Sequence, residues 1–446
     1  IQPLPNLEFK FVTANTLIGL PQQESSPIKS EQTEMFDDRE KIDDLRLIRE
    51  QYFTASGIGR EQLKTEFVTA QKILVGQLIK EHGYIGISKA ELTQKLTDWE
   101  PFSHKASDWF DSDWMFGIKK GFDIVIGNPP YIQIKQISWD DRKIYQNNYL
   151  FATGRFNIFY LFIELAAKLI GSSGLTSFIV PDRLLLNTQL SDLRAWLLND
   201  LSLIEIVSFD ETVFESAVVD SIILLFSKGQ LDETVRVKNK ATVEGIINQE
   251  SMIIPKTFFK ITQNTQFNLN YNPLASDIIT KINAMSVLLK TIAETKDGII
   301  QGKVADKLFL KAPIDGKSKK LLFGKDIGRY KITFNDNWVN YNPDEMMKLE
   351  VNRRGEGIRP GLWMRNPKIF ERAKILTRQT ADEIIAVFDT DQHYYSNTLH
   401  GTTIINENYS PWYVLGILNS NLMTWYYRYT TAEEGKVFAQ IKVKLL

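Results

Sequence analysis

The hydrophobic positions in the first part of the chain recur at helical spacing in two segments. Apolar side chains fall on one face over residues 31–55 and again over residues 60–82, with the period of about 3.6 residues that marks an amphipathic helix. Between the segments, Ser56-Gly57-Ile58-Gly59 interrupts the pattern, as glycine does at a turn. The pattern predicts a helical hairpin that follows a polar loop over residues 21–29.

Shorter runs with strand character stand on either side of this hairpin. Residues 7–12 alternate between polar and apolar side chains, which predicts a strand. The apolar run Ile124–Ile126 ends at Gly127 and predicts a buried strand. A helical pattern over residues 157–170 separates it from three further apolar runs, at 175–180, 203–209 and 221–226. Strands that alternate with a helix predict an open α/β sheet.

Three connecting regions have less regular patterns. Residues 98–116 are rich in Trp and Phe, and we expect them to pack on the sheet, because such aromatics are core far more often than site. Residues 133–155 predict a polar loop that could fold over a substrate. Residues 228–275 predict a connector with short strands.

The tetrad Asn128-Pro129-Pro130-Tyr131 follows the predicted strand at its carboxyl end, the edge where open α/β sheets bind ligands. Proline fixes φ and removes a backbone donor, so this turn can offer carbonyl oxygens to a pocket. The Asn128 side-chain oxygen and the Pro129 carbonyl could accept both hydrogens of an aromatic amine, whose lone pair is otherwise delocalised into its ring. Tyr131 adds a ring on which a base could stack. The alternative is a Pro-rich turn that only ends a core strand.

Composition narrows the possible chemistry. The chain has no cysteine, which excludes disulfides, thiol nucleophiles and Cys-ligated zinc. Its four histidines show no metal-ligand spacing, so we expect no metal site. No apolar run approaches the roughly 18 residues that span a membrane, so we expect no membrane partner and a cytoplasmic protein.

Charge is distributed unevenly along the chain. Residues 281–446 carry 25 Lys and Arg against 18 Asp and Glu, whereas residues 1–280 carry 28 against 36. A basic carboxyl-terminal part is typical of a module that faces nucleic acid.

The tetrad and the strand before it resemble those of the DNA methyltransferases that methylate exocyclic amines. In that family, Asn at the position of Asn128 implies adenine rather than cytosine as the target base. Phe214, in the connection between the predicted strands at 203–209 and 221–226, resembles the second aromatic that stacks on the flipped adenine opposite Tyr131. Glutamine methyltransferases that act on release factors share the tetrad, but the Phe214 connection argues against them.

The resemblance implies S-adenosylmethionine as cofactor. Asn15 would match the polar residue that hydrogen-bonds the cofactor adenine, although a turn residue is an equally good interpretation. Phe162 would match an aromatic that touches the same adenine, with a plain core position as the alternative. The glycine-rich turn that cradles the cofactor has no counterpart here. We therefore expect a fragment whose partner is an amino-terminal region of the same polypeptide.

Sequence strings in the carboxyl-terminal part resemble the TaqI-like specificity domain of type IIG restriction-modification enzymes. The strings are Leu321–Tyr330, Pro367–Gln379, Trp412–Ser420 and Lys436–Lys442, and in the family more structure follows the last one. Such a domain implies double-stranded DNA as partner, held by cations at phosphates and read by side chains in the grooves. Each candidate could instead be a solvated or paired surface side chain. The candidate DNA-binding residues are Lys325, Arg329, Arg353, Arg354, Arg365, Lys374, Arg378 and Gln379.

The expected fold is α/β, with a Rossmann-like methyltransferase core that is incomplete at its amino end. The core would comprise residues 1–20 and 98–275, a helical-hairpin insertion residues 21–97, and a mixed α/β target-recognition domain residues 285–446. The expected function is adenine methylation of DNA within a type IIG-like restriction-modification enzyme. A phage-defence methyltransferase without nuclease and a non-catalytic DNA-binding fragment are the alternatives. No carboxylate pair with a lysine suits metal-assisted cleavage, so we expect no nuclease in this chain.

Overall fold

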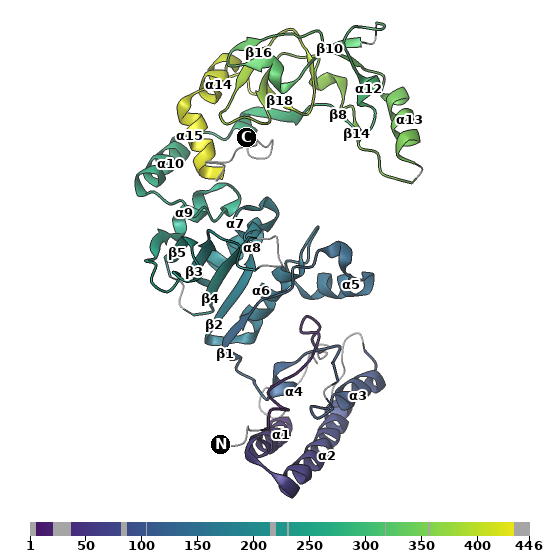
Figure 1. The fold of residues 1–446 in the computed structure, drawn as a ribbon, viewed down its shortest axis with the longest axis vertical. Helices are drawn as coiled ribbons and strands as arrows, with labels where there is room; N and C mark the ends of the chain where they lie inside the picture. The colour runs from purple at the N-terminus through teal and green to yellow at the C-terminus, as the bar shows by residue number, and fades with distance from the viewer. Residues whose placement is uncertain are drawn as a thin grey trace. The chain divides into compact units, whose positions relative to one another are not determined.

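A computed structural model of the chain describes residues 6–20, 37–81, 87–103, 105–214, 220–229, 232–316, 318–355 and 357–431. The chain divides into two compact units (Figure 1). The first comprises Ile1–Leu184 with Asp192–Lys256, and the second comprises Leu185–Ser191 with Thr257–Leu446. The expected α/β fold class is confirmed, and the string Lys436–Lys442 lies outside the described residues.

The first unit opens with a small helical layer. Helices α1 (Asp37–Thr54) and α2 (Gly57–Glu81) form the predicted hairpin, and α3 (Lys89–Asp98) packs on α2. Ser88 fixes the start of α3, because its hydroxyl accepts the Glu91 backbone N–H at 3.2 Å while the Glu91 carboxylate accepts the Ser88 N–H at 3.0 Å. Such a reciprocal cap satisfies two donors that a helix start leaves unpaired.

The residues flanking this hairpin join its core rather than the sheet. Buried Phe9, Trp99, Trp109 and Trp114 belong to the same apolar cluster as the buried side chains of α1 and α2. The predicted strand at 7–12 is wrong, because residues 8–10 form a turn. The nearest β-pairing among the described residues is an isolated bridge from Ala14 to Ser107.

The expectation that residues 98–116 pack on the sheet is also wrong for most of their rings. The exception is Phe116 of α4 (Ser112–Phe116), whose ring lies 6.1 Å from that of Phe122. A two-helix hairpin has little apolar surface of its own, and these aromatic rings supply the rest of its core.

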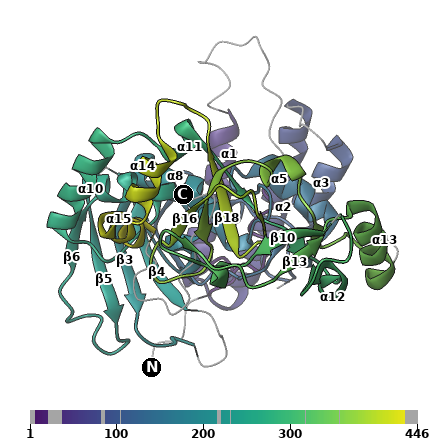
Figure 2. The ribbon, with the colours of Figure 1, turned by 90° about the horizontal axis from the view of Figure 1, so that it is seen from above.

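Six strands form the sheet of the first unit, in the order β1-β2-β4-β3-β5-β6. Strands β1 and β2 are parallel, β4 runs antiparallel to both of its neighbours, and β3 is parallel to β5. Strands β1, β2 and β3 therefore share one direction, and their carboxyl ends lie at one edge of the sheet. Figure 2 shows β3, β5 and β6 side by side. The bounds are β1 Phe122–Gly127, β2 Ile170–Pro181, β3 Ser202–Phe209, β4 Ser221–Ser227, β5 Thr234–Ala241 and β6 Met252–Pro255, which confirms all four strands predicted within residues 122–227.

Strand β1 stands at the end of this sheet and is not buried as predicted. Ile124 and Ile126 are 66% and 79% exposed, although their apolar run is typical of a covered strand. Within the described residues only β2 pairs with β1. The sequence pattern identified the strand correctly but not its exposure, which depends on what packs beside it.

Helices cover the sheet and connect its strands. Helix α6 (Ile158–Leu169) is confirmed; Asn157 caps it, because the Asn157 Oδ1 accepts the Phe159 N–H at 3.3 Å. The predicted loop at 133–155 is partly wrong, since α5 (Trp139–Asn148) forms inside it with Ser138 as cap. Asp140 and Asp141 in its first turn favour a helix start. The next helices along the chain are α7 Arg183–Leu186, α8 Ser191–Asn199 and α9 Lys256–Ile261, of which α9 belongs almost entirely to the second unit.

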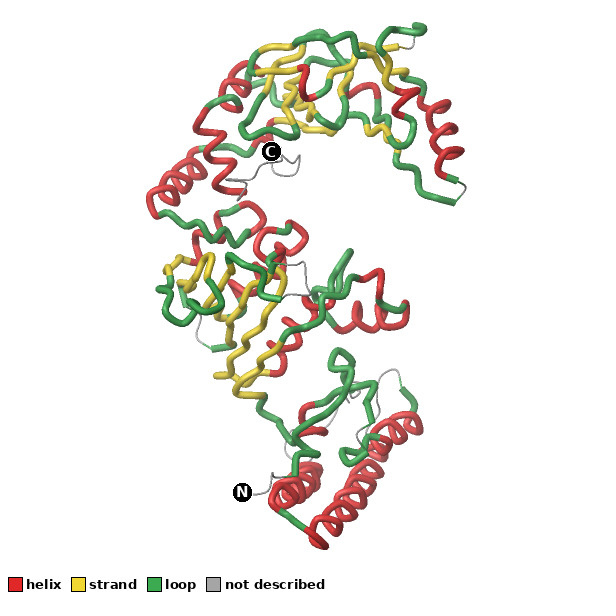
Figure 3. Tube along the Cα trace, viewed as in Figure 1, coloured by secondary structure: helices red, strands yellow, loops and turns green. Residues whose placement is uncertain are grey.

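The second unit contains two four-stranded sheets, ordered β16-β15-β18-β7 and β17-β10-β13-β9. One apolar cluster contains buried residues of both sheets, and a second packs β15 and β16 against α14. Figure 3 shows its short strands joined by long loops, with helices α13 to α15 beside them. The strands are β7 Ala293–Asp297, β8 Ile300–Gln301, β9 Phe309–Leu310, β10 Ser318–Leu322, β11 Ile327–Gly328, β12 Lys331–Ile332, β13 Trp338–Asn340, β14 Leu362–Trp363, β15 Lys374–Arg378, β16 Ala386–Asp389, β17 Tyr394–Tyr395 and β18 Leu399–Ile404. The helices are α10 Pro273–Met285, α11 Leu289–Ile292, α12 Ala305–Leu308, α13 Pro343–Arg354, α14 Pro411–Leu418 and α15 Asn421–Thr431.

Candidate active site and DNA interface

The tetrad leaves the sheet where β1 ends. Gly127, the last residue of β1, is in register with Phe178 of β2, so residues 128–131 start at the carboxyl edge of two parallel strands. Just beyond the tetrad the Ile158 N–H donates to the Ile132 carbonyl at 2.9 Å, and the Ile134 N–H to the Phe156 carbonyl at 3.2 Å. These bonds attach the chain after the turn to the start of α6 and so fix the turn from both sides.

The two proposed acceptors of the tetrad are not used by the protein. Asn128 is exposed, and its side chain forms no hydrogen bond among the described residues. The Pro129 carbonyl likewise accepts no hydrogen bond there, although the residue itself is buried. A residue that only ends a strand usually bonds its own backbone. Neither acceptor is thus taken by the described part of the protein, and that of Asn128 is open to an outside donor.

Tyr131 is held in place, in contrast to the free Asn128. Its hydroxyl donates to the Ile179 carbonyl of β2 at 3.2 Å, and its ring meets that of Phe159 edge-on at 6.1 Å. Burial raises the pKa of Tyr131, against a hydrogen bond with Ser221 that lowers it, so the phenol keeps its proton at neutral pH. A ring fixed in this way can present a face to a base without losing much side-chain entropy.

Phe214 stands in the connection that the sequence resemblance singled out. The ring is half-buried, and residues 215–219 after it lie outside the described residues. The connection starts where β3 ends at Phe209 and stops at Ser221, which is in register with Pro181 at the end of β2. It therefore leaves the same sheet edge as the tetrad. Stacking of a base between Tyr131 and Phe214 stays a prediction.

The two residues predicted to bind the cofactor, Asn15 and Phe162, have different surroundings. The Asn15 Oδ1 accepts the Leu17 N–H at 3.3 Å, and the Tyr145 hydroxyl also hydrogen-bonds the Asn15 side chain. Asn15 thus serves a turn and does not end a strand, since no strand forms there. Phe162 is half-buried on α6 among buried neighbours. Their roles at a cofactor stay predictions.

Most of the candidate DNA-binding cations in the second unit are engaged by protein oxygens. Arg329 pairs with Glu383 at 3.0 Å, and Arg354 pairs with the buried Glu350. The others contact carboxylates or carbonyls too: Arg353 contacts Asp306 and the Lys303 carbonyl, Arg365 contacts Asp297 and the Gly298 carbonyl, and Arg378 contacts the Ile327 carbonyl. The surplus of positive charge in this part of the chain therefore overstates the number of cations free for phosphate.

The prediction for Lys374 is wrong. Its side chain is fully buried, and its ammonium donates to the Asp389 carboxylate at 2.7 Å and to the Phe370 carbonyl at 2.8 Å. His393 contacts the other oxygen of Asp389 through Nδ1 at 2.8 Å. Lys374 belongs to a buried ionic cluster. Strand β15 is buried from Lys374 to Thr377 without alternation, so the sequence pattern could not show whether Lys374 is buried or exposed.

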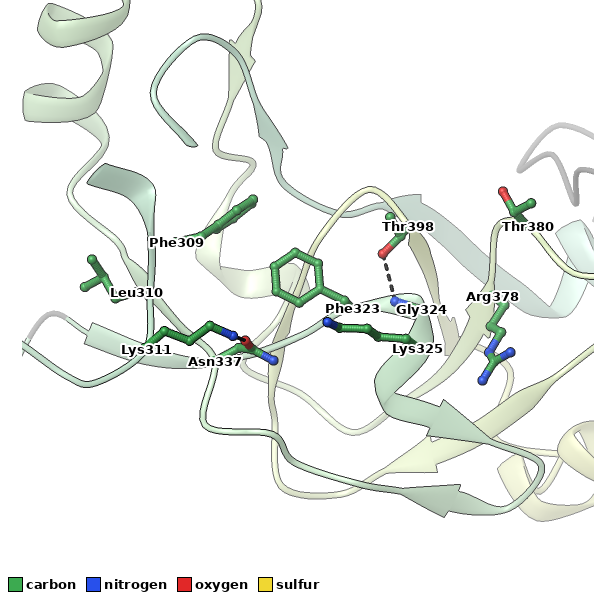
Figure 4. Close-up of a pocket in the computed structure, with 10 residues that line it drawn as sticks. All are labelled: Phe309, Leu310, Lys311, Phe323, Gly324, Lys325, Asn337, Arg378, Thr380 and Thr398. Carbon is green, nitrogen blue, oxygen red and sulfur yellow. Dashed lines mark hydrogen bonds between the residues drawn. The ribbon is translucent and has the colours of Figure 1, made fainter. Parts of the chain in front are cut away.

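A pocket of about 580 Å³ opens in the second unit beside Lys325 (Figure 4). Lys325 is exposed and has no hydrogen bond or ion pair among the described residues, while Gln379 is half-buried on the neighbouring β15 side. Lys311, Phe323 and Thr398 also line the pocket, and the sequence analysis did not select them. The lining consists of Phe309, Leu310, Lys311, Phe323, Gly324, Lys325, Asn337, Arg378, Thr380 and Thr398.

Within the described ranges, no group of three or more His, Asp or Glu side chains is arranged to hold a metal ion. No helix of those ranges is long and apolar enough to cross a bilayer.

Comparisons with solved structures found long alignments at low identity and low TM-scores. A type IIL restriction-modification enzyme, MmeI, in complex with DNA aligns over 92% of this chain and 63% of its own, at 12% identity and a TM-score of 0.45. The type IIG restriction endonuclease BpuSI aligns over 92% of this chain and 58% of its own, at 13% identity and a TM-score of 0.35.

Sequence comparisons identify both parts of the chain. Residues 33–214 match the family described as Eco57I restriction-modification methylase, and residues 319–446 match the TaqI-like C-terminal specificity domain. A putative type II restriction enzyme and methyltransferase of Methanocaldococcus jannaschii is 25% identical over 359 residues, 74% of this chain and 26% of the relative. A type II methyltransferase of Acinetobacter calcoaceticus, M.AccI, is 22% identical over 232 residues, 48% of this chain and 42% of the relative.

The chain thus spans about a quarter of the archaeal relative and less than half of the bacterial one. The two matched regions agree with the order of units in the fold, methylase first and specificity domain second. Residues 33–214 are thus similar to the Eco57I restriction-modification methylases and residues 319–446 to the TaqI-like specificity domain, and the relatives found are type II restriction-modification enzymes and methyltransferases.

Proposed function

We propose that this chain methylates the 6-amino group of an adenine that is flipped out of double-stranded DNA. The observation that carries the proposal is the state of the tetrad. Asn128 and Pro129 keep their acceptor oxygens free at the sheet edge, while Tyr131 beside them is fixed through Ile179. Two free acceptors next to a fixed ring suit an amine on a flat aromatic base.

The tetrad acts by orienting the amine. With one hydrogen on the Asn128 oxygen and the other on the Pro129 carbonyl, the nitrogen can turn its lone pair out of the ring plane. Tyr131 supports one face of the base, and Phe214 is the candidate for the other, each stacking face being worth on the order of 1–3 kcal/mol. Since Asn128 is exposed, the proton released after methylation can pass to solvent.

S-adenosylmethionine is the proposed cofactor, and when bound it supplies an electrophilic methyl group. Phe162 and Asn15 are the residues that would hold its adenine. The fit is better for Phe162, whose ring is partly open, than for Asn15, whose carboxamide already serves its own turn and Tyr145.

The specificity domain is proposed to bind the DNA around the target base. Of the eight candidates from the sequence, Lys325 is the cation that no described residue engages, and Lys374 is excluded by burial. We therefore assign Lys325 first to phosphate contact, with Arg378 beside it at the pocket.

The product of the reaction tests this proposal. Full-length protein is incubated with bacterial genomic DNA and S-adenosylmethionine carrying a heavy-isotope methyl group, and the digested nucleosides are analysed by mass spectrometry. We expect label in N6-methyladenine. Label in N4-methylcytosine, or in protein glutamine instead of DNA, would contradict the assignment of the base.

A further inference from the structure

The pocket in the second unit has two chemically different sides. In the view of Figure 4, the rings of Phe309 and Phe323 stand on one side, Arg378 on the other, and Lys325 between them. The two rings meet edge-on at 5.2 Å, and both are only partly buried. An aromatic wall that faces cations is the combination that binds single-stranded nucleic acid.

The charge of the pocket is unbalanced. Three cations, Lys311, Lys325 and Arg378, line it, and no described lining residue is acidic. The Arg378 Nε donates to the Ile327 carbonyl at 3.1 Å, which leaves Nη1 without a partner among the described residues. Lys311 donates to the Asn337 Oδ1 at 2.7 Å, a neutral partner that leaves its charge uncompensated. An anion would find three donors here.

The wall behind these cations is prearranged. Asn337 is buried, and while its Oδ1 accepts from Lys311, its Nδ2 donates to the buried Asp326 at 3.3 Å. Asp326 also accepts the Phe323 backbone N–H at 2.8 Å. This chain of hydrogen bonds fixes Lys311 and the backbone of Phe323 before any ligand arrives, which reduces the entropy that binding costs.

The size of the pocket selects among anions. Its volume of about 580 Å³ falls within the usual range of small-molecule sites, roughly 300–1,000 Å³. A lone phosphate would leave the aromatic side empty. A base inside a duplex has both faces covered by its neighbours and cannot reach a phenyl ring. A nucleotide that has left the stack offers both a phosphate and a bare face.

We propose that this pocket takes one unpaired nucleotide of the bound DNA, with its phosphate on the cationic side and its base against the two phenyl rings. The proposal rests on the proposed function, because flipping of an adenine leaves its former partner unpaired at every target site. The pocket would then help to hold the DNA open while the methylation proceeds.

The test compares two DNA probes by fluorescence anisotropy with the full chain. One is a matched duplex, and the other is the same duplex with a single bulged-out thymidine. We expect the bulged duplex to bind about tenfold more tightly, the size of effect that one stacked base gives. Phe323→Leu keeps apolar volume against the core but removes the aromatic face, so it should abolish this preference.

If Phe323→Leu does not fold, Lys325→Gln provides a second test. Position 325 is exposed, so this substitution should not disturb folding. It should weaken binding of the bulged duplex more than that of the matched one. Lys348→Gln on α13 is the matched control, since it removes the same charge from an exposed position outside the pocket. It should leave the preference for the bulged duplex intact.

Other outcomes overturn the proposal in distinguishable ways. Equal affinity of the unaltered chain for both duplexes would refute the nucleotide pocket but leave DNA binding by the specificity domain standing. Equal weakening of both probes by Lys325→Gln, with no effect of Phe323→Leu, would show an ordinary backbone phosphate contact. No binding of either duplex would refute this proposal together with the proposed function.

Discussion

Two polar groups at the sheet edge of the first unit lack partners in the part of the protein that the structure describes, whereas the candidate cations on the second unit are mostly paired. At the sheet edge, the Asn128 amide and the Pro129 carbonyl have no partner among the described residues. In the second unit, by contrast, six of the seven candidate cations contact protein oxygens, and Lys325 is the exception. A polar group that the fold leaves unused is a better indication of a ligand than a charge counted in the sequence.

The buried pair in the second unit should give the largest effect on stability. Lys374→Met removes the ammonium that pairs with Asp389 and leaves a buried carboxylate with a weaker set of partners. Breaking a buried pair costs about 3–5 kcal/mol. Denaturant unfolding should show this loss, whereas Lys348→Met, at an exposed position, should unfold like the unaltered protein. A change below about 1 kcal/mol for Lys374→Met would contradict a structural role.

Acid should remove part of the same stabilisation. Burial pushes the pKa of Asp389 upward, but the hydrogen bond from His393 and the charge of Lys374 outweigh it and hold this pKa below its ordinary value. A carboxylate with a lowered pKa stabilises the fold above its unfolded pKa of about 3.9, and this contribution is lost as the pH falls through the folded value. Unfolding followed by tryptophan fluorescence between about pH 3 and 7 should steepen at the acid end, and Asp389→Asn should flatten that slope. An unchanged slope in this variant would assign the acid sensitivity to other carboxylates.

Substitutions of Tyr131 test whether its ring supports the base. Tyr131→Ala removes a stacking face worth about 1–3 kcal/mol, so the KM for DNA should rise about 5- to 150-fold. Tyr131→Phe loses the hydrogen bonds of the hydroxyl to Ile179 and Ser221 but keeps the ring, so its KM should remain close to that of the unaltered protein. Similar KM values for the two variants would show that the ring does not support the base.

Substitution of Arg353 should have the smallest effect on DNA affinity and tests the second half of the comparison, the paired cations. Its guanidinium contacts Asp306 and the Lys303 carbonyl, so little of it is left for phosphate. Arg353→Ala should change the affinity for matched duplex DNA by less than threefold, whereas Lys325→Ala should weaken it further. The reverse order in an anisotropy titration would mean that Arg353 exchanges its partners for DNA.

The sequence predicted local elements better than their surroundings. The helical hairpin, α6 and strands β1 to β4 follow from periodicity and turn residues, which are local properties. The exposure of Ile124 and Ile126 depends on what packs beside β1, and no pattern inside the strand encodes it. The burial of Lys374 depends on Asp389, fifteen residues away in the sequence. Pairings of this kind decide which charges are free, and only the fold reveals them.

Methyl transfer by Asn128→Ala tests the central claim most directly. Removing one preorganised hydrogen-bonding group from a reacting centre lowers kcat by about 100- to 1,000-fold, and the KM for DNA should change little, because Tyr131 still supports the base. Asn248→Ala, at an exposed loop position in the same unit, should retain full activity. If Asn128→Ala instead methylates DNA within about threefold of the unaltered rate, the Asn128 amide does not orient the amine and the account is contradicted.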